Sequence, residues 1–318
     1  MSHPEALPEG APDSPLLSIV MPAYNYGEVV SRAVESVLAQ MRPDCELVVI
    51  DDGSSDGTPQ VLEAIHAQNR PGFRWTRQEN AGAAAARNAG MRSSRGAFLL
   101  FFDADDELLP HALDAVCGAI RANPQASVIL GGRITRRAEG HEKYHSPPAR
   151  LAADPCTRIA DYLVHKRIGM GHGSTVVKRE LMAQRSYPEN LQGSEDIPVF
   201  AFLFAYGVFA MVDQPLVRIH KHHDSLRHLK PVADERATVL VAEIFGDLPA
   251  ACMKVRGPYA ARRYLSLFRI ALRAGDTAGA RRYLSQAAKM DFLQILKPGQ
   301  VRKALKAGLS ALARRSRD

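Results

Sequence analysis

The sequence has no long hydrophobic run and no signal peptide. Its longest apolar run, 199–212, covers 14 residues with Gly207 included, whereas a membrane-spanning helix needs about 20. The N-terminus lacks the basic start and the apolar centre of a secretory signal. We therefore expect a cytoplasmic protein.

Cysteine is also scarce. The four cysteines, Cys45, Cys117, Cys156 and Cys252, lie far apart and form no C-x-x-C pair. This spacing fits neither a disulfide framework nor a zinc site. We expect free thiols, most of them buried.

A net positive charge is absent from the first three quarters of the chain. Residues 1–240 carry 25 Lys and Arg against 29 Asp and Glu, whereas residues 241–318 carry 16 against 5. The formal net charge of +7 therefore comes from the C-terminal segment. A nucleic-acid-binding protein normally carries its positive charge over its working surface, so this distribution argues against nucleic acid as a partner.

Three regions are expected along the chain. Residues 1–15 are rich in Pro, Glu and Ala without an apolar period, which predicts a disordered tail. Residues 16–235 alternate short apolar runs with amphipathic segments of helical length, and residues 236–318 have a helical, basic pattern. The alternation predicts an α/β fold in which helices flank a mainly parallel sheet, followed by a C-terminal helical extension.

The individual elements follow from the same patterns. Strands are predicted at 16–23, 46–50, 73–77, 97–102, 126–130 and 174–178, and a strand pair or a bend at 210–220. Helices are predicted at 28–40, 58–69, 82–93, 110–122 and 195–206. The polar segment 132–172 is predicted to be irregular, either an insertion over an active-site mouth or a passive surface loop. Two copies of A-R-R-Y-L, at 261–265 and 280–284, flank a turn-like segment and predict a helical hairpin.

The last segment, 299–315, has an amphipathic pattern. Val301, Leu305, Leu309 and Leu312 fall on one helical stripe, and basic residues fall on the other side. Such a helix suits an anionic membrane surface. Packing on the catalytic domain or formation of a homodimer is the alternative.

Polar side chains follow the first two expected strands, where open α/β sheets bind their ligands. The first strand ends in M-P-A-Y-N, and the ring of Tyr24 can either offer its face to a nucleotide base or remain an ordinary aromatic at the edge of the core. The second ends in D-D-G-S-S-D-G-T. Asp51 and Asp52 can accept hydrogen bonds from a base or a ribose, while Asp56 can cap the next helix.

Three acids follow the expected strand at 97–102. Clustered carboxylates such as Asp103, Asp105 and Asp106 repel one another unless a cation joins them. An EF-hand is excluded because the glycine at its sixth loop position is missing, and a helix cap needs only one of these acids. The motif therefore predicts a divalent metal site.

Phosphate-binding loops are absent. No G-x-G-x-x-G follows the first strand and no G-x-x-x-x-G-K-S/T occurs. The Gly/Ala-rich helix at 79–90, which carries Arg87 and Asn88, can lie close beneath a ligand. We expect a metal to meet the ligand's phosphates.

Two later motifs add candidate residues. Glu195 and Asp196 stand at an expected helix start, where they can cap the helix or, near a metal site, take a proton from a hydroxyl. R-I-H-K-H-H-D-S, at 218–225, holds three histidines. We single out His220 because it follows an apolar strand.

Together and in this order, these motifs resemble family 2 of the inverting glycosyltransferases, which have the GT-A nucleotide-sugar fold. The matching pieces are SIVMPAYN, ELVVIDDGSSDGT, NAGAAAARNAG, GAFLLFFDADDELLP, GSED and RIHKHHDS, within residues 17–225. Pro198 departs from the family's pattern, although a proline in a first helical turn is tolerated.

The resemblance implies roles on the side of the nucleotide-sugar donor. In this sequence, the residues that it places around the donor are Pro22, Tyr24, Asp52, Arg87 and Asp103. Tyr24 and Asp52 would hold the base, Asp103 the ribose, and Arg87 would line the pocket. A UDP-sugar is favoured as the donor.

The resemblance also implies how the reaction runs. Asp105, with Asp103, would bind Mn²⁺ or Mg²⁺ at the donor's diphosphate, and His220 would lie near it. Asp196 would be the general base, with Glu195 positioning the acceptor, so that the sugar passes with inversion to a hydroxyl of a glycan, a lipid-linked or another acceptor. A catalytically inactive module that binds a nucleotide-sugar or a glycan, and a sugar nucleotidyltransferase, are the alternatives.

Overall fold

The computed structural model describes residues 14–221 and 234–305. The chain forms two compact units. Unit 1 comprises Met1–Arg150, Met170–Glu195 and Gly207–Ser225, and unit 2 comprises Leu151–Gly169, Asp196–Tyr206 and Leu226–Asp318. The expected tail at 1–15 lies, except for its last two residues, outside the described part of the chain.

Unit 1 is built on one sheet. Within the described residues it has nine strands: β1 (Leu17–Ala23), β2 (Cys45–Asp51), β3 (Phe73–Arg77), β4 (Phe98–Phe101), β5 (Glu107–Leu108), β6 (Val128–Arg136), β7 (Glu142–His145), β8 (Thr175–Lys178) and β9 (Phe209–His220). The order is β3-β2-β1-β4-β8-β6-β9-β5, and β7 pairs with β6. Strands β1 to β4 pair in parallel, as does β6 with β9, whereas β8 runs antiparallel to both of its neighbours.

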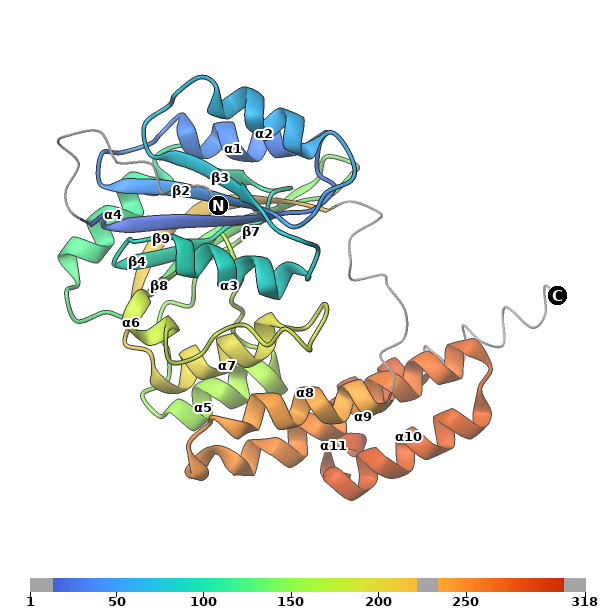
Figure 1. The fold of residues 1–318 in the computed structure, drawn as a ribbon. Helices are drawn as coiled ribbons and strands as arrows, with labels where there is room; N and C mark the ends of the chain where they lie inside the picture. Colours follow the sequence, from blue (N-terminus) through green and yellow to red (C-terminus); the bar gives the residue numbers. More distant parts are fainter. Residues whose placement is uncertain (1–13, 222–233, 306–318) are drawn as a thin grey trace. The chain divides into compact units, whose positions relative to one another are not determined.

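Helices cover both faces of the parallel strands. Unit 1 contains α1 (Val30–Leu38), α2 (Thr58–His66), α3 (Ala83–Ser93), α4 (Ala112–Ala122) and the short α6 (Arg179–Met182). Helices α1 and α2 lie on one face of β1–β3 and α3 lies on the other (Figure 1). Side chains alternate between these faces along β2: Leu47 and Val49 join the core under α1, whereas Val48 packs with Ala86 of α3. The α/β sheet expected from the sequence is confirmed.

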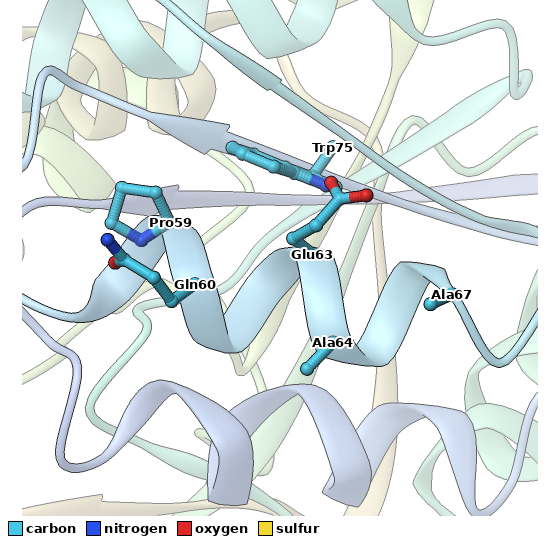
Figure 2. Close-up of a pocket in the computed structure, with 6 residues that line it drawn as sticks. All are labelled: Pro59, Gln60, Glu63, Ala64, Ala67 and Trp75. Carbon is cyan, nitrogen blue, oxygen red and sulfur yellow. The ribbon is translucent and has the colours of Figure 1, made fainter.

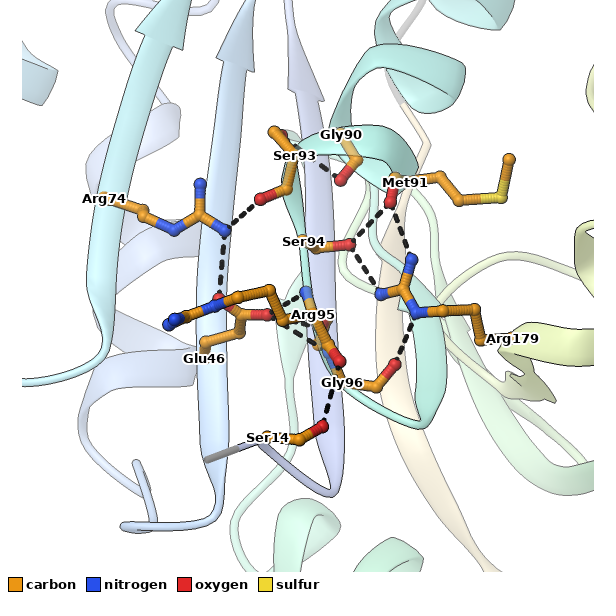
Figure 3. Close-up of polar contacts among 11 residues, drawn as sticks. Ser14, Glu46, Arg74, Gly90, Met91, Ser93, Ser94, Arg95, Gly96 and Arg179 are labelled. Carbon is orange, nitrogen blue, oxygen red and sulfur yellow. Dashed lines mark hydrogen bonds and ion pairs between the residues drawn. The ribbon is translucent and has the colours of Figure 1, made fainter. Parts of the chain in front are cut away.

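The amino ends of the parallel strands are joined by buried polar contacts (Figure 3). Glu46 of β2 is 4% exposed, and its carboxylate accepts hydrogen bonds from the Ser18 hydroxyl at 2.7 Å and from the Arg95 backbone N–H at 2.6 Å. Arg74 of β3 donates to the same carboxylate at 3.0 Å. Arg179 binds the turn between α3 and β4 through two carbonyl oxygens and a hydroxyl. These contacts fix the strand order opposite the end where the acids lie.

The segment 132–172 is more regular than expected. Residues to Arg136 extend β6, and β7 forms a hairpin with them. Residues 155–165, in unit 2, form α5 (Pro155–Ala160) and a π-helical turn, η1 (Asp161–His165). The prediction was wrong because the polar hairpin strands lack an apolar period: β7 is largely exposed. The segment 210–220, expected as a strand pair or a bend, is one strand with irregular register opposite Gly131 and Gly132.

Unit 2 is helical. Besides α5 and η1 it contains α7 (Asp196–Tyr206), α8 (Asp234–Gly246), the 3₁₀ helix η3 (Ala250–Val255), α9 (Arg256–Ala274), α10 (Thr277–Met290) and α11 (Phe292–Leu296). Helices α9 and α10 form the expected hairpin (Figure 1). Gly275 ends α9 in the left-handed region, and the Asp276 side chain caps α10. No helix in the described ranges is long and apolar enough to cross a membrane.

The cysteines correct one expectation. Cys156 of α5 and Cys252 of η3 form a disulfide within unit 2, 96 residues apart in sequence. Spacing gave no sign of it, because the fold and not a local motif brings α5 and η3 together. Cys45 and Cys117 are free and buried, as expected, with their sulfurs 3.7 Å apart.

Candidate active site

Strand β4 delivers three acids into one turn. Beyond its last residue, Phe102 and Ala104 are fully buried and anchor the chain, while Asp103 and Asp105 are partly exposed and Asp106 is buried. The backbone N–H of Asp106 donates to the carbonyl of Asp103 at 3.1 Å and closes the turn. The expected acidic cluster is therefore present at the carboxyl end of a central strand.

The three acids act on one another electrostatically. Burial and the charges of Asp103 and Asp105 raise the pKa of Asp106 to about 9. Burial and the same carboxylates also raise the pKa of the Tyr26 hydroxyl. The turn therefore concentrates negative charge in a partly buried place, and a cation would relieve the repulsion.

The acids of this turn could hold a metal ion whose remaining ligands come from the substrate. In the described ranges, the acids of this turn do not form a group of three converging metal-ligand atoms with any His, Cys, Asp or Glu. Such a group is formed instead by Asp44, Cys45 and Cys117, at the opposite end of β2. Mg²⁺ typically takes one or two carboxylates and fills its remaining positions with substrate phosphate and water. Asp103 and Asp105 can supply such carboxylates.

Arg87 of α3 links two acids from distant parts of the chain. Its side chain is 7% exposed, with Nη2 2.9 Å from Oδ1 of Asp103 and Nη1 2.9 Å from Oε1 of Glu195. Burial acts to lower the pKa of Arg87, but these carboxylates outweigh it and raise the pKa. Arg87 therefore stays charged and holds Asp103 and Glu195 at a fixed separation.

Glu195 has one unused oxygen. Its Oε2 is buried and has no hydrogen-bond partner among the described residues. A buried acceptor without a donor is unfavourable. A bound hydroxyl group would supply that donor.

The neighbouring Asp196 begins α7 and is partly buried. Pro198 lies in the same first turn, where its missing N–H is harmless. Asp196 belongs to unit 2, whereas Glu195 is the last residue of its segment of unit 1.

His172 and Tyr187 complete the surroundings of Arg87 and were missed from the sequence. His172 Nε2 lies 3.0 Å from the Tyr187 hydroxyl, and its Nδ1 lies 3.8 Å from Oδ1 of Asp103. The Arg87 guanidinium stands over the Tyr187 ring, 5.4 Å from its centroid. Burial, with the charge of Arg87, lowers the pKa of His172 to about 3, so this imidazole is neutral at neutral pH. No short motif marks either residue.

Asn88, next to Arg87 on α3, positions this group. Its side-chain amide donates to the Tyr187 carbonyl at 2.9 Å and accepts from the Tyr187 backbone N–H at 2.9 Å. The paired bonds hold the segment that carries Tyr187 against α3.

His220, the last residue of β9, lies beside the acids. Its backbone N–H donates to Oδ1 of Asp106 at 3.1 Å, and its Nε2 lies 3.4 Å from Oε2 of Glu107. Burial and the charge of Arg32 lower the pKa of His220. Arg32 itself donates to the carbonyl oxygen of Asp105 at 2.6 Å. The structure thus brings His220 to the acidic turn; the rest of the histidine motif, from His222, lies outside the described residues.

The residues expected at the base follow β1 and β2. Pro22 is buried in β1, and Tyr24, one residue beyond the strand, is 47% exposed. Asp52 is 2% exposed, and its carboxylate accepts hydrogen bonds from the Ala81 and Gly82 backbone N–H groups at 2.9 and 2.8 Å. Asp52 therefore holds the start of α3 in this structure.

A shallow pocket lies apart from the acidic turn, between α2 and the edge strand β3. Figure 2 shows Trp75 of β3 lying against the exposed side of α2, above Glu63. The residues that line this pocket are Pro59, Gln60, Glu63, Ala64, Ala67 and Trp75. None of them is among the candidates from the sequence.

Comparison with known proteins identifies the class. The fold resembles that of S. aureus TarS 1-349 in complex with UDP-GlcNAc, with a TM-score of 0.66 over 94% of this chain and 91% of that one at 20% identity. This similarity establishes the GT-A fold.

Sequence comparison gives the family. The family described as "Glycosyl transferase family 2" matches residues 18–185, so the chain belongs to that family. The succinoglycan biosynthesis protein ExoO of Rhizobium meliloti is 30% identical over 203 residues, 61% of this chain and 57% of that protein. An uncharacterized glycosyltransferase of Nostoc sp., alr2836, is 34% identical over 113 residues, 36% of this chain and 35% of that protein. The chain thus spans about a third to a little over half of these relatives.

Proposed function

We propose that the protein transfers a sugar from a UDP-sugar to an acceptor hydroxyl, with inversion and with the help of Mn²⁺ or Mg²⁺. The observation that carries this proposal is the link from Asp103 through Arg87 to Glu195, with both bonds at 2.9 Å. It joins the acidic turn expected at the donor to the Glu-Asp pair expected at the acceptor. The related fold of TarS in complex with UDP-GlcNAc supports uridine as the base.

On the donor side, each residue has a proposed task. Pro22 and Tyr24 line the base, and Asp52 accepts a hydrogen bond from it through Oδ2, because Oδ1 already accepts from both Gln78 and Ala81 whereas Oδ2 accepts from Gly82. Asp103 binds the ribose and, with Asp105, the metal. When bound, the metal neutralises charge on the diphosphate and assists its departure as a Lewis acid.

On the acceptor side, Asp196 takes the proton of the attacking hydroxyl. The acceptor oxygen then forms a bond to the anomeric carbon while the bond from that carbon to the diphosphate oxygen breaks on the opposite face. Glu195 orients the hydroxyl through the oxygen that has no partner within the described residues. His220 lies by the acidic turn and faces the diphosphate. General-base catalysis of this kind contributes about 10²–10⁴-fold.

Two further claims concern the setting of the enzyme. We propose that residues 16–235 carry the chemistry in the cytoplasm, and that the basic region 236–318 contacts the anionic inner face of the membrane. Phe292, Leu293 and Leu296 support this, because α11 leaves these apolar side chains 58–70% exposed among basic residues. A homodimer formed through the same surface is the competing outcome. The relative in succinoglycan biosynthesis supports a role in cell-surface polysaccharide assembly.

Calorimetric titration tests the proposal. UDP, GDP and dTDP are titrated separately into the full chain with Mn²⁺ and again with EDTA. We expect UDP to bind with metal and at least tenfold more weakly in EDTA, and Asp105→Asn to remove the metal effect. If no nucleotide binds with metal present, the protein is not a nucleotide-sugar transferase. Tight binding of UDP with no turnover of any UDP-sugar would favour the inactive binding module.

A further inference from the structure

Three cations of unit 2 that act on one another electrostatically, Lys166, Arg262 and Arg263, have no acidic partner at ion-pair distance among the described residues. Lys166 follows the π-helical turn η1 in a left-handed backbone conformation, with φ of 57°. Its Nζ lies 5.1 Å from the centroid of the Tyr162 ring. Arg262 of α9 donates to the carbonyl of Val164 in the same turn. These contacts place Lys166 and Arg262 at η1.

The positive charges are close enough to act on one another. Burial, followed by the charges of Arg262 and Arg263, lowers the pKa of Lys166, and the opposing effect of Asp196 is smaller. Like charges at close range destabilise a fold unless a ligand or a partner compensates them. Three cations beside one carboxylate leave a net positive charge here.

A buried hydroxyl without a partner lies in the same place. Tyr259 of α9 is 3% exposed, and its hydroxyl has no hydrogen-bond partner among the described residues. Arg263, Asp196 and Arg262 all act on its titration, so it lies within their electrostatic reach. A buried phenol without a partner is costly, and a ligand oxygen would satisfy it.

We propose that Lys166, Arg262, Arg263 and the Tyr259 hydroxyl bind a phosphate group of the acceptor, so that the acceptor is a phosphate-bearing molecule. Guanidinium groups match the several oxygens of a phosphate, and an ammonium adds a point charge. Three cations also match a phosphate, which can carry more than one negative charge, better than they match a carboxylate, which carries one. The inference rests on the proposed function at one point: it takes Asp196 as the general base. Because Asp196 acts on the titration of Lys166 and Tyr259, the cluster would then lie beside the attacking hydroxyl.

The sequence contains a matched control. Arg263 and Arg282 occupy the same position in the two copies of A-R-R-Y-L, on α9 and α10, but Arg282 is exposed and stacks on Tyr283. Arg263→Ala and Arg282→Ala therefore remove the same charge from similar helices. The Arg263 side chain makes no hydrogen bond within the described residues, so its loss leaves the backbone contacts of α9 intact. Lys166→Gln serves as a second variant, with circular dichroism to confirm folding.

The experiment measures binding of phosphate-bearing probes to the full chain, by calorimetry, after saturation with UDP and Mn²⁺ and again without them. The probes are a short poly(glycerol phosphate), geranyl diphosphate and, for comparison, a glucuronate-containing oligosaccharide. We expect one phosphate probe to bind, at least tenfold more weakly to Arg263→Ala and Lys166→Gln, and within twofold of wild type to Arg282→Ala. Which probe binds distinguishes a polyol phosphate chain from a lipid diphosphate.

Two results would overturn the inference: equal weakening by Arg263→Ala and Arg282→Ala, or binding of the glucuronate probe as tight as that of the phosphate probes. UDP binding is measured separately in every variant and should not change. If the wild-type protein does not bind UDP, the proposed donor is wrong. The phosphate site is then tested by the titrations of the phosphate probes in the absence of UDP.

Discussion

Arg87 Nη2 and Asp103 Oδ1 lie 2.9 Å apart at a place where the arginine side chain is almost fully buried. The other arm of the same guanidinium reaches Glu195. A lysine retains the charge but cannot hold two carboxylates with a planar fork.

Arg87→Lys should therefore fold with a loss of about 1–3 kcal/mol, because one buried carboxylate loses its donor. Sugar transfer should fall by about 100-fold, since both acids lose their fixed positions. Thermal unfolding and initial rates measure the two effects. Arg92→Lys, on the exposed side of α3, should change neither the stability nor the transfer rate. Equal losses of stability and rate in Arg92→Lys would show that Arg87 has no special role.

Asp196→Asn tests the proposed base. The amide has nearly the same shape but cannot take a proton, so UDP binding should persist while turnover falls by about 10²–10⁴-fold. Asp213→Asn, an exposed acid of β9, is the control. Turnover of Asp196→Asn within a fewfold of wild type would show that another group acts as the base.

Glu46 should make stability depend on pH. Burial acts to raise its pKa, but hydrogen bonds from the Arg95 backbone, Ser18 and Arg74 prevail, and the pKa of Glu46 in the folded protein is lowered. A lowered folded-state pKa contributes stability above the unfolded value of about 4.3 and loses it as pH falls through the folded value.

We therefore expect Glu46→Gln to be less stable than wild type at pH 7 by about 1–3 kcal/mol. The gap should narrow as the pH falls below about 4, the range in which the unfolded-state group titrates. Urea unfolding at several pH values measures this difference in stability. Glu63→Gln, at an exposed position of α2, is the control. A gap that does not depend on pH would contradict the account.

The disulfide joins Cys156 and Cys252, which are 96 residues apart in the sequence, and so closes a long loop. Bridges of this kind typically contribute about 2–4 kcal/mol, mainly by restricting the unfolded chain. Oxidised protein should thus unfold at a lower temperature once dithiothreitol is added, and Cys252→Ser should not respond to it. Thiol titration of denatured, unreduced protein should find only Cys45 and Cys117. Four free thiols would show that the bridge is open, the state that a reducing cytoplasm favours.

Phe292 and Leu293 are 60% and 70% exposed, whereas Gln294 beside them is 4% exposed. Because α11 turns its polar side chain inward and exposes Phe292, Leu293 and Leu296, an anionic bilayer is the partner that we propose. Replacing both apolar residues by serine should weaken sedimentation with phosphatidylglycerol vesicles at least tenfold, given about 1.5–3 kcal/mol for each buried side chain. The pair Val239→Ser and Ile270→Ser, also exposed in unit 2, is the control. A change in oligomeric state without a change in vesicle binding would favour a second copy.

The sequence predicted the parallel half of the sheet well because β1, β2 and β4 are mainly apolar runs with polar residues at or just beyond their carboxyl ends. The same feature made Asp103 and Asp105 candidates, since acids at the end of a buried strand are conspicuous. His172 and Tyr187 were missed because their segment has no period, and tertiary structure brings His172 to Asp103 and the Tyr187 ring to the Arg87 guanidinium. The disulfide was missed for the same reason, as pairing across 96 residues depends on tertiary structure.

The expected amphipathic helix at 299–315 is described only as far as Leu305. Its first turns are helical, and Val301 and Leu305 are 42% and 65% exposed. Leu309 and Leu312 lie outside the described residues. The apolar residues of α11 were not noticed in the sequence, because five residues are too few to show a helical period.

Gly90, one turn beyond Arg87 on α3, lies directly against β1: a Cβ atom at this position would stand 2.3 Å from Cγ1 of Val20. The helix can approach the sheet this closely only because residue 90 has no side chain. A single added methyl group would push α3 outward and carry Arg87 away from Asp103 and Glu195. In a random mutagenesis screen scored by sugar transfer, Gly90 would therefore be recovered alongside the acids, although it has no functional group to contribute.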